Sequence, residues 1–121
     1  MAGKLVHYEL PASDTKRATQ FYGQLFGWKF NDSGMPGIDY QLVEGNPGGA
    51  VYKAEDGAAG PKIYFDTDDI DASIAKVREL GGQSDDKGPI PGTGWFAACM
   101  DTEGNAFSLF QSDESVAPPG Q

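Results

Sequence analysis

The sequence predicts an α+β fold made of two βαβββ modules in tandem. Two observations lead to this prediction. Each half of the chain contains an alternating strand, an amphipathic helix and then short strands separated by turn residues. The two halves also match at a single shift in numbering. With 121 residues, the chain has the size of one domain, expected over 1–121, with modules at 5–53 and 61–111 and a flexible tail at 112–121.

The first module is expected to open with a strand at residues 5–10, because apolar and polar residues alternate there. Its packing face would carry Val6, Tyr8 and Leu10, and its other face His7 and Glu9. An amphipathic helix follows, with Ser13 or Asp14 as its N-cap and Gly27 as its end. The expected packing face of this helix is Ala18, Phe21, Tyr22, Leu25 and Phe26. Three short strands are expected at 28–30, 40–43 and 50–52.

The second module repeats this order. A strand is expected at 62–66, and then a helix capped by Asp68 or Asp69 and ended by Gly81 and Gly82. The apolar positions of this helix are Ile70, Ile74, Val77 and Leu80. A weak strand is expected at 83–86, and two longer ones at 95–100 and 106–111 around a tight turn. The Gly/Pro-rich residues 85–94 are expected to form a surface loop, with a lid over a pocket as the alternative.

The helix caps define the register between the two halves. Asp14 and Asp69 are 55 positions apart, and the same shift takes His7 to Lys62. The tripeptide Glu-Gly-Asn occurs at 44–46 and again at 103–105, and with a one-residue gap Ala50 corresponds to Ser108. An internal duplication is the simplest explanation.

Composition excludes several classes of partner. The 18 acidic residues outnumber the 9 basic ones, so the net charge of −9 disfavours nucleic acids and anionic membranes. No apolar run resembles a signal peptide or a membrane span, and we therefore expect a cytoplasmic protein. Cys99 is the single cysteine, which excludes an intrachain disulfide. Its apolar surroundings favour a structural thiol over a nucleophile.

Four segments, taken in order, resemble the vicinal-oxygen-chelate superfamily. The superfamily includes glyoxalases, extradiol dioxygenases, fosfomycin-modifying enzymes and bleomycin-binding resistance proteins. The segments are VHYELP at 6–11, FYGQLFGW at 21–28, FDTDDID at 65–71 and DTEGN at 101–105. The helix ending in FYGQLFGW is most similar to a bacterial, glyoxalase-related branch. The resemblance covers residues 5–111 and implies that the paired modules form a cup-shaped half-barrel.

The resemblance also implies where metal ligands would lie, on the first and last strand of each module. These positions are His7, Ala50, Lys62 and Ser108. Only His7 is a strong ligand, because alanine has no donor atom, neutral serine is a poor ligand and lysine must first lose a proton. A weak divalent metal held by His7 and Glu9 is one interpretation, and a Glu9–Lys62 ion pair is the favoured one. The sequence assigns no cofactor, and a bound divalent metal is kept as an alternative.

The candidate site residues follow from the faces of the expected strands. His7 is the candidate general base, with Glu9 holding its tautomer and Tyr64 or Lys62 polarising a substrate oxygen. The alternative is a histidine that is only hydrogen-bonded inside a cavity. The expected ligand-binding residues are Lys62, Trp95, Phe96, Ser108 and Phe110. For Trp95 and Phe96, of which one would stack on a flat ligand, packing in the core is the alternative.

Three functions are consistent with these residues. The first is a metal-independent protein that binds a small aromatic or cationic molecule in its cup. Its metal site would be degenerate. The second is a divalent-metal-dependent lyase, isomerase or dioxygenase that uses His7 and an atypical partner. The third is a regulatory subunit with a vestigial cup. The resemblance also implies a homodimer.

Overall fold

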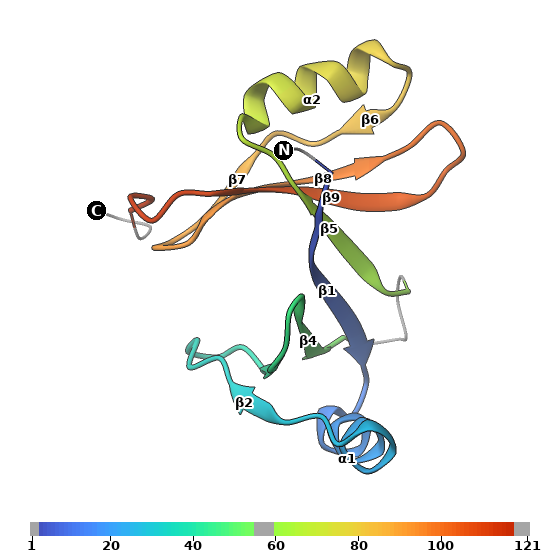
Figure 1. The fold of residues 1–121 in the computed structure, drawn as a ribbon, viewed down its shortest axis with the longest axis vertical. Helices are drawn as coiled ribbons and strands as arrows, with labels where there is room; N and C mark the ends of the chain where they lie inside the picture. The colour runs from blue at the N-terminus through green and yellow to red at the C-terminus, as the bar shows by residue number, and fades with distance from the viewer. Residues whose placement is uncertain (1–2, 55–59, 118–121) are drawn as a thin grey trace. The chain divides into compact units, whose positions relative to one another are not determined.

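The computed structural model describes residues 3–54 and 60–117, and it confirms the predicted α+β fold class (Figure 1). The elements in these residues are β1 Leu5–Ala12, α1 Thr15–Phe26, β2 Phe30–Asp32, β3 Tyr40–Val43, β4 Gly48–Lys53, β5 Lys62–Asp66, α2 Ile70–Glu79, β6 Gln83–Ser84, β7 Gly88–Ile90, β8 Gly94–Met100 and β9 Ala106–Ser112. The chain divides into two compact units. The first unit is Val6–Lys62, and the second combines Met1–Leu5 with Ile63–Gln121.

Each unit contains a sheet in which the first and last strands of a module run side by side. In the first unit the strand order is β2-β3-β4-β1, with β1 and β4 parallel and the other pairs antiparallel. In the second unit the order is β5-β9-β8-β6, with β5 and β9 parallel and β7 also paired with β8. The helix of each module and the strands that follow it supply the long connection that a parallel pair needs.

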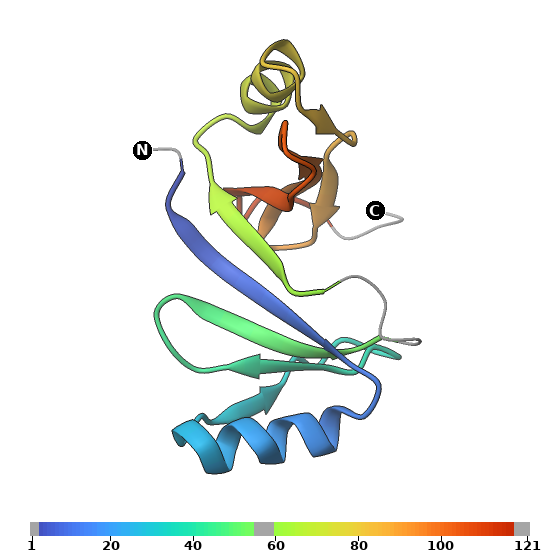
Figure 2. The same ribbon diagram turned by 90° about the vertical axis from the view of Figure 1, so that its right-hand side faces the viewer.

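Helix α1 lies along one face of the first sheet (Figure 2), and aromatic rings pack between the two. Tyr8 on β1 lies opposite Gly49 on β4, where a Cβ atom would overlap the Tyr8 ring. Trp28 stacks on Tyr22 of α1 with ring centroids 5.1 Å apart, and its centroid lies 6.0 Å from that of Tyr8. Glycine at position 49 therefore makes room for the ring that links the sheet to the helix.

Helix α1 begins and ends where the sequence predicts, but its predicted packing face is partly wrong. Asp14 accepts a hydrogen bond from the backbone N–H of Arg17, and Gly27 ends the helix in the left-handed conformation, at φ 73°. No residue of α1 is buried. Phe21, Leu25 and Phe26 are 59%, 57% and 58% exposed. Of the predicted face, Tyr22 stacks on Trp28 and Phe26 lies against the same ring, at 5.1 Å and 5.2 Å between centroids.

The core of the second unit lies between α2 and its sheet. Ile70 and Ile74 of α2 are buried against Ala97 and Cys99 of β8 and Leu109 of β9. Val77, Trp95 and Phe107 pack around this cluster. The predicted cap is confirmed, because the Asp69 side chain accepts from the backbone N–H of Ala72 at 3.1 Å. The prediction for Leu80 is wrong, since it follows the helix and is 65% exposed.

The Gly/Pro-rich loop contains a strand that the sequence did not reveal. Residues Gly88–Ile90 form β7 and pair with β8, so that Gly88 lies opposite Phe96 and Ile90 opposite Gly94. Gly88 has no side chain to collide with the Phe96 ring, which a Cβ atom would approach to 3.0 Å. Pro89 is tolerated because β7 is bonded on one side by β8, at the edge of the sheet. The segment is therefore partly sheet.

Both ends of the described chain join the second unit. The N–H of Gly3 donates to the carbonyl of Asp66, and the N–H of Asp66 donates to the carbonyl of Lys4, both at 2.9 Å. The expected flexible tail is structured as far as Val116, which is 7% exposed and accepts a hydrogen bond from the N–H of Gly92. The rest of the predicted tail, residues 118–121, lies outside the described residues. No helix in the described ranges is long and apolar enough to cross a membrane.

Candidate functional site

Three side chains meet on the face of the first sheet opposite α1. The Tyr40 hydroxyl lies 2.6 Å from Nε2 of His7 and donates to Oε2 of Glu9, also at 2.6 Å. His7 Nε2 and Glu9 Oε2 are 3.8 Å apart, and the two side chains are 28% and 13% exposed. We call His7, Glu9 and Tyr40 the polar cluster. It is half-buried, so each polar contact in it is stronger than it would be at the open surface.

The polar cluster bridges two strands that are not neighbours, because β4 lies between β1 and β3. Ala50 of β4 is the register partner of both Glu9 and Leu42, and it is fully buried. A methyl side chain at this position leaves room for Tyr40 to reach across β4. Ala50, which has no donor atom for a metal, thus provides the space for the Tyr40 hydroxyl group.

The hydrogen bonds define the tautomer of His7. A carboxylate only accepts, so the single hydroxyl proton of Tyr40 is donated to Glu9. The Tyr40 oxygen must then accept from Nε2–H of His7, and the lone pair of the neutral ring lies on Nδ1. The role of Glu9 in holding the tautomer stays a prediction, and Tyr40 lies between the two side chains.

Tyr40 was missed by the sequence reasoning, which placed it correctly in a strand. The pairing of β3 with β4 and of β4 with β1 brings it to His7, and that pairing depends on strand register. One signal in the sequence could have identified it. Strand alternation places Tyr40 and Gln41 on opposite faces of the expected strand. A tyrosine on the face of a sheet that carries His7 and Glu9 was a candidate hydrogen-bond partner.

Lys62 lies beside a second tyrosine on the first unit. Its ammonium group is 5.5 Å from the ring centroid of Tyr52, a cation–π distance. Tyr52 is the register partner of Tyr40, with ring centroids 6.4 Å apart. Lys62 therefore flanks an aromatic pair that adjoins the polar cluster. The Glu9–Lys62 ion pair stays a prediction.

The other expected site residues lie in the second unit. Tyr64 pairs with Ser108 in the register of β5 and β9, and Phe110 is the register partner of Phe96 on β8. By strand alternation, these four residues share the sheet face opposite the core residue Leu109. Ser108 is 6% exposed. Their catalytic and ligand-binding roles stay predictions.

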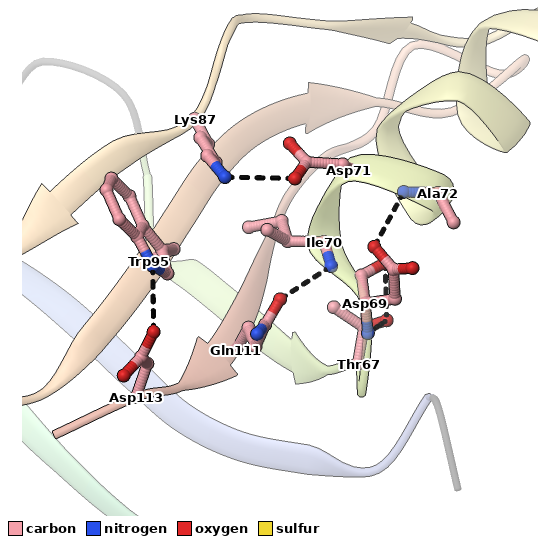
Figure 3. Close-up of polar contacts among 9 residues, drawn as sticks. All are labelled: Thr67, Asp69, Ile70, Asp71, Ala72, Lys87, Trp95, Gln111 and Asp113. Atoms are coloured by element: carbon pink, nitrogen blue, oxygen red, sulfur yellow. Dashed lines mark hydrogen bonds and ion pairs between the residues drawn. The ribbon is translucent and has the colours of Figure 1, made fainter. Parts of the chain in front are cut away.

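Trp95 lies on the other face, and its predicted role in stacking on a ligand stays a prediction. It packs around the α2 core cluster, as the core alternative expected. Its Nε1–H donates to Asp113 at 3.3 Å, and the ammonium of Lys87 lies 4.5 Å from its ring centroid while also bonding Asp71 (Figure 3). The indole thus contacts Lys87, which precedes β7, and Asp113, which follows β9. Of the two candidates, only Phe96 is on the opposite face.

Cys99 has the properties of a structural thiol, as predicted. It is 7% exposed and its Sγ–H donates to the Ser84 hydroxyl at 3.4 Å. Burial raises the pKa of the Cys99 thiol, and the hydrogen bond with Ser84 opposes that shift only in part. A raised pKa reduces the thiolate fraction, so this residue is a poor nucleophile.

The donor set does not fit a resident divalent metal. In the parts of the chain that the structure describes, no three His, Cys, Asp or Glu side chains gather in a way that could hold a metal ion. Ala50 has no donor atom, and Nε2 of His7 and a carboxylate oxygen of Glu9 both bond the Tyr40 hydroxyl. An ion between these two atoms would have to displace that hydroxyl. The Tyr40 hydroxyl thus already bonds the two atoms that a metal ion would need as ligands.

Comparison with protein families agrees with this architecture. The family model described as "Glyoxalase-like domain" matches residues 7–110. A "Glyoxylase-like domain-containing protein" of Didymella fabae is 34% identical over 119 residues, covering 88% of this chain and 92% of that protein. The "Putative glyoxylase CFP32" of Mycobacterium bovis is 30% identical over 118 residues. That match covers 89% of this chain and 45% of the relative, so the chain spans about half of its length.

Solved structures show the same fold at low sequence identity. Methylmalonyl-CoA epimerase from Mycobacterium tuberculosis is similar with a TM-score of 0.71 and 16% identity, covering 91% of this chain and 88% of that one. A glyoxalase/bleomycin resistance protein/dioxygenase superfamily member from Vibrio splendidus 12B01 gives 0.67 and 15%, covering 93% and 100%. These likenesses concern the fold.

Proposed function

Because the chain belongs to the glyoxalase-like domain family of the vicinal-oxygen-chelate superfamily, we propose that it binds a small molecule without a resident metal. The site proposed is the face of the first sheet that carries the polar cluster and the neighbouring Tyr52. The observation that carries the proposal is the Tyr40 hydroxyl, which bonds both His7 and Glu9 at 2.6 Å. In this proposal, the hydrogen-bonded side chains of His7, Glu9 and Tyr40 take the place of a metal ion at a degenerate metal site.

The ligand class follows from the chemistry of this face. Tyr40 and Tyr52 present a pair of aromatic rings, and Glu9 supplies a carboxylate that is 13% exposed. Aromatic faces attract cations, and a half-buried carboxylate adds a charge-assisted acceptor. A flat aromatic cation satisfies both groups. Lys62, on the edge of this face, would select against a second positive charge.

The test uses phenyltrimethylammonium as the cationic aromatic probe and benzenesulfonate as its anionic counterpart. Titration calorimetry on the whole chain, with and without EDTA, should show saturable binding of the cation that EDTA leaves unchanged. Glu9→Gln should weaken binding about tenfold or more, since a charge-assisted bond contributes roughly 1.5–3 kcal/mol. Glu44→Gln is the matched control, because Glu44 is exposed and lies outside the cluster. Stoichiometric metal in the purified protein, or binding that needs added metal, would contradict the proposal.

A second candidate function is proton transfer, and the hydrogen-bond chain from Glu9 through Tyr40 to His7 favours it. Nδ1 of His7 would remove a proton from a C–H group next to a substrate carbonyl. The electron pair of that bond moves to the carbonyl oxygen, and the new imidazolium is stabilised by Tyr40 and Glu9. Lys62 would stabilise the resulting enolate.

Deuterium exchange distinguishes this activity from binding alone. Methylmalonyl-CoA, the compound in the name of a structurally similar enzyme, is the probe. Deuterium wash-in from D₂O, followed by NMR, should be lost in His7→Ala and reduced in Tyr40→Phe. Exchange that persists in His7→Ala rules out His7 as the base. Binding without exchange leaves the first function.

A further inference from the structure

We propose that a pocket in the second unit binds a small neutral aromatic alcohol, of which phenol is the simplest example. The pocket has a volume of about 380 Å³ and is lined by residues of β5, α2 and β9. Every described residue that lines it belongs to the second unit, whereas the polar cluster belongs to the first. The inference therefore concerns a separate site and does not rest on the proposed function.

The pocket lies beside the part of the sheet that α2 covers. Ile70 and Ile74 of α2 are buried against β8 and β9, and β5 is the next strand after β9. Phe65 of β5 is the register partner of Leu109, and its ring packs on that of Phe107 with centroids 6.0 Å apart. Two aromatic rings and a leucine thus form an apolar wall next to the helix.

The wall and the volume suit an aromatic ring. A cavity of roughly 150 Å³ already accommodates benzene. The planes of the Phe65 and Phe107 rings are inclined by 56° to each other. Because aromatic rings pack well edge to face, a third ring can lie against one of these two. The pocket is therefore large enough for a single aromatic ring that carries a substituent.

Two hydroxyl groups form the polar edge of the pocket. Thr67 Oγ1 and Ser73 Oγ lie 2.6 Å apart, and Thr67 Oγ1 also lies 3.3 Å from the carbonyl oxygen of Asp69. If Thr67 donates to Asp69, Ser73 donates to Thr67 and keeps lone pairs that can accept. If Thr67 donates to Ser73, the Ser73 proton can be donated to a ligand. Within the described part of the chain, Ser73 therefore has capacity for one more hydrogen bond in either arrangement.

A hydroxyl group is the ligand group that suits Ser73 in both arrangements, because it donates as well as accepts. An anion is disfavoured, since the segment 66–71, whose first two residues line the pocket, holds four carboxylates and no cation. A cation is not required either, because Asp69 caps α2 and Asp71 pairs with Lys87 at 3.0 Å. These features together favour a neutral aromatic alcohol.

The first test is an NMR titration of the whole chain with phenol at neutral pH, where phenol is uncharged. Binding should saturate with a dissociation constant of about 1 mM or lower. The shift changes should centre on residues 65–67, 73 and 107–109. Toluene, which lacks the hydroxyl group, should bind about two- to tenfold more weakly, and benzoate should not bind. No saturation by about 10 mM phenol, or shift changes centred in the first unit, would overturn the proposal.

The second test separates the hydroxyl contact from packing. Ser73→Ala should weaken phenol binding about two- to tenfold and leave toluene binding unchanged, because only phenol can bond the serine. Ser73→Leu should abolish the binding of both molecules by filling the pocket. Ala75→Leu is the matched control, since it enlarges an exposed position on the same helix and should bind phenol as the natural chain does.

Circular dichroism shows whether each variant is folded. If Ser73→Leu does not fold, the comparison of phenol with toluene in Ser73→Ala still decides the outcome. Equal loss of phenol and toluene binding in Ser73→Ala would overturn the hydroxyl contact. Unchanged phenol binding in a folded Ser73→Leu would overturn the pocket as the site.

Discussion

The Tyr40 hydroxyl donates a 2.6 Å hydrogen bond to Glu9 across the intervening strand β4. The same oxygen lies 2.6 Å from Nε2 of His7. One atom therefore links the imidazole and the carboxylate of the polar cluster. Its removal leaves both groups on β1 without the hydroxyl that they share.

Tyr40→Phe should destabilise the protein by about 1–3 kcal/mol, because the half-buried carboxylate and imidazole would each lose a partner. The free energy of unfolding from urea titration measures this loss. Tyr22→Phe is the matched control, because Tyr22 is also half-buried in aromatic rings but is engaged through its ring. Equal stability of Tyr40→Phe and the natural chain would show that the cluster contributes nothing to the fold.

Gly49→Ala should cost about 1–3 kcal/mol through overpacking, because the added methyl group meets the Tyr8 ring. The near-ultraviolet circular dichroism of the aromatic rings should change as well. At Gly60, a Cβ atom meets nothing within 4 Å, so Gly60→Ala should lie within about 0.5 kcal/mol of the natural chain. Equal effects of both variants would mean that Tyr8 moves without cost.

Cys99 should react slowly with Ellman's reagent at pH 8 in the folded protein and rapidly in 6 M guanidinium chloride. Burial raises the pKa of this thiol and limits access to it. Absorbance at 412 nm gives both rates. A folded-state rate close to that of the unfolded chain would contradict a structural thiol.

The turn between β8 and β9 should lose stability in acid. The side chain of Asn105 is the main cause that lowers the pKa of Asp101, assisted by the backbone N–H of Asn105 and, more weakly, of Glu103. A lowered pKa of Asp101 stabilises the fold at pH values above the pKa of the same group in the unfolded chain, which is near 4. This stabilisation is lost as the pH falls through the pKa of the group in the folded protein.

Asp101→Asn should therefore be less stable than the natural chain at pH 7, and the difference should shrink as the pH falls below about 4. Thermal unfolding at several pH values measures this. In Asn105→Ala, the NMR titration of the Asp101 carboxyl group should shift upward toward its ordinary range. A stability difference that is independent of pH would exclude the carboxylate as its cause.

The fold could be predicted because its signals are local. Asp14 and Asp69 cap their helices through their own side chains, and Gly27 ends α1 through its own backbone conformation. The strand β7 was missed because its pairing overrides the turn-forming character of Gly88 and Pro89. The exposure of Phe21 could not be read from helical spacing, which gives a side chain's direction but not the presence of a neighbour.

The candidate site was predictable only in part, for a similar reason. His7 and Glu9 share a strand, so alternation alone places them together. Tyr40 comes from a strand two positions away in the sheet, and its approach depends on the registers of two strand pairs. Trp95 and Phe96 are adjacent in sequence, yet one packs around the α2 core and the other faces away.

The backbone of Gly3 and Lys4 pairs with Asp66, which lies 62 or more residues further along the chain. These contacts cannot form on a ribosome until Asp66 has emerged, whereas the partners of the first sheet are already present by then. The first sheet can thus fold while the chain is still being synthesised. Gly3 and Lys4 pair with the second sheet late in synthesis.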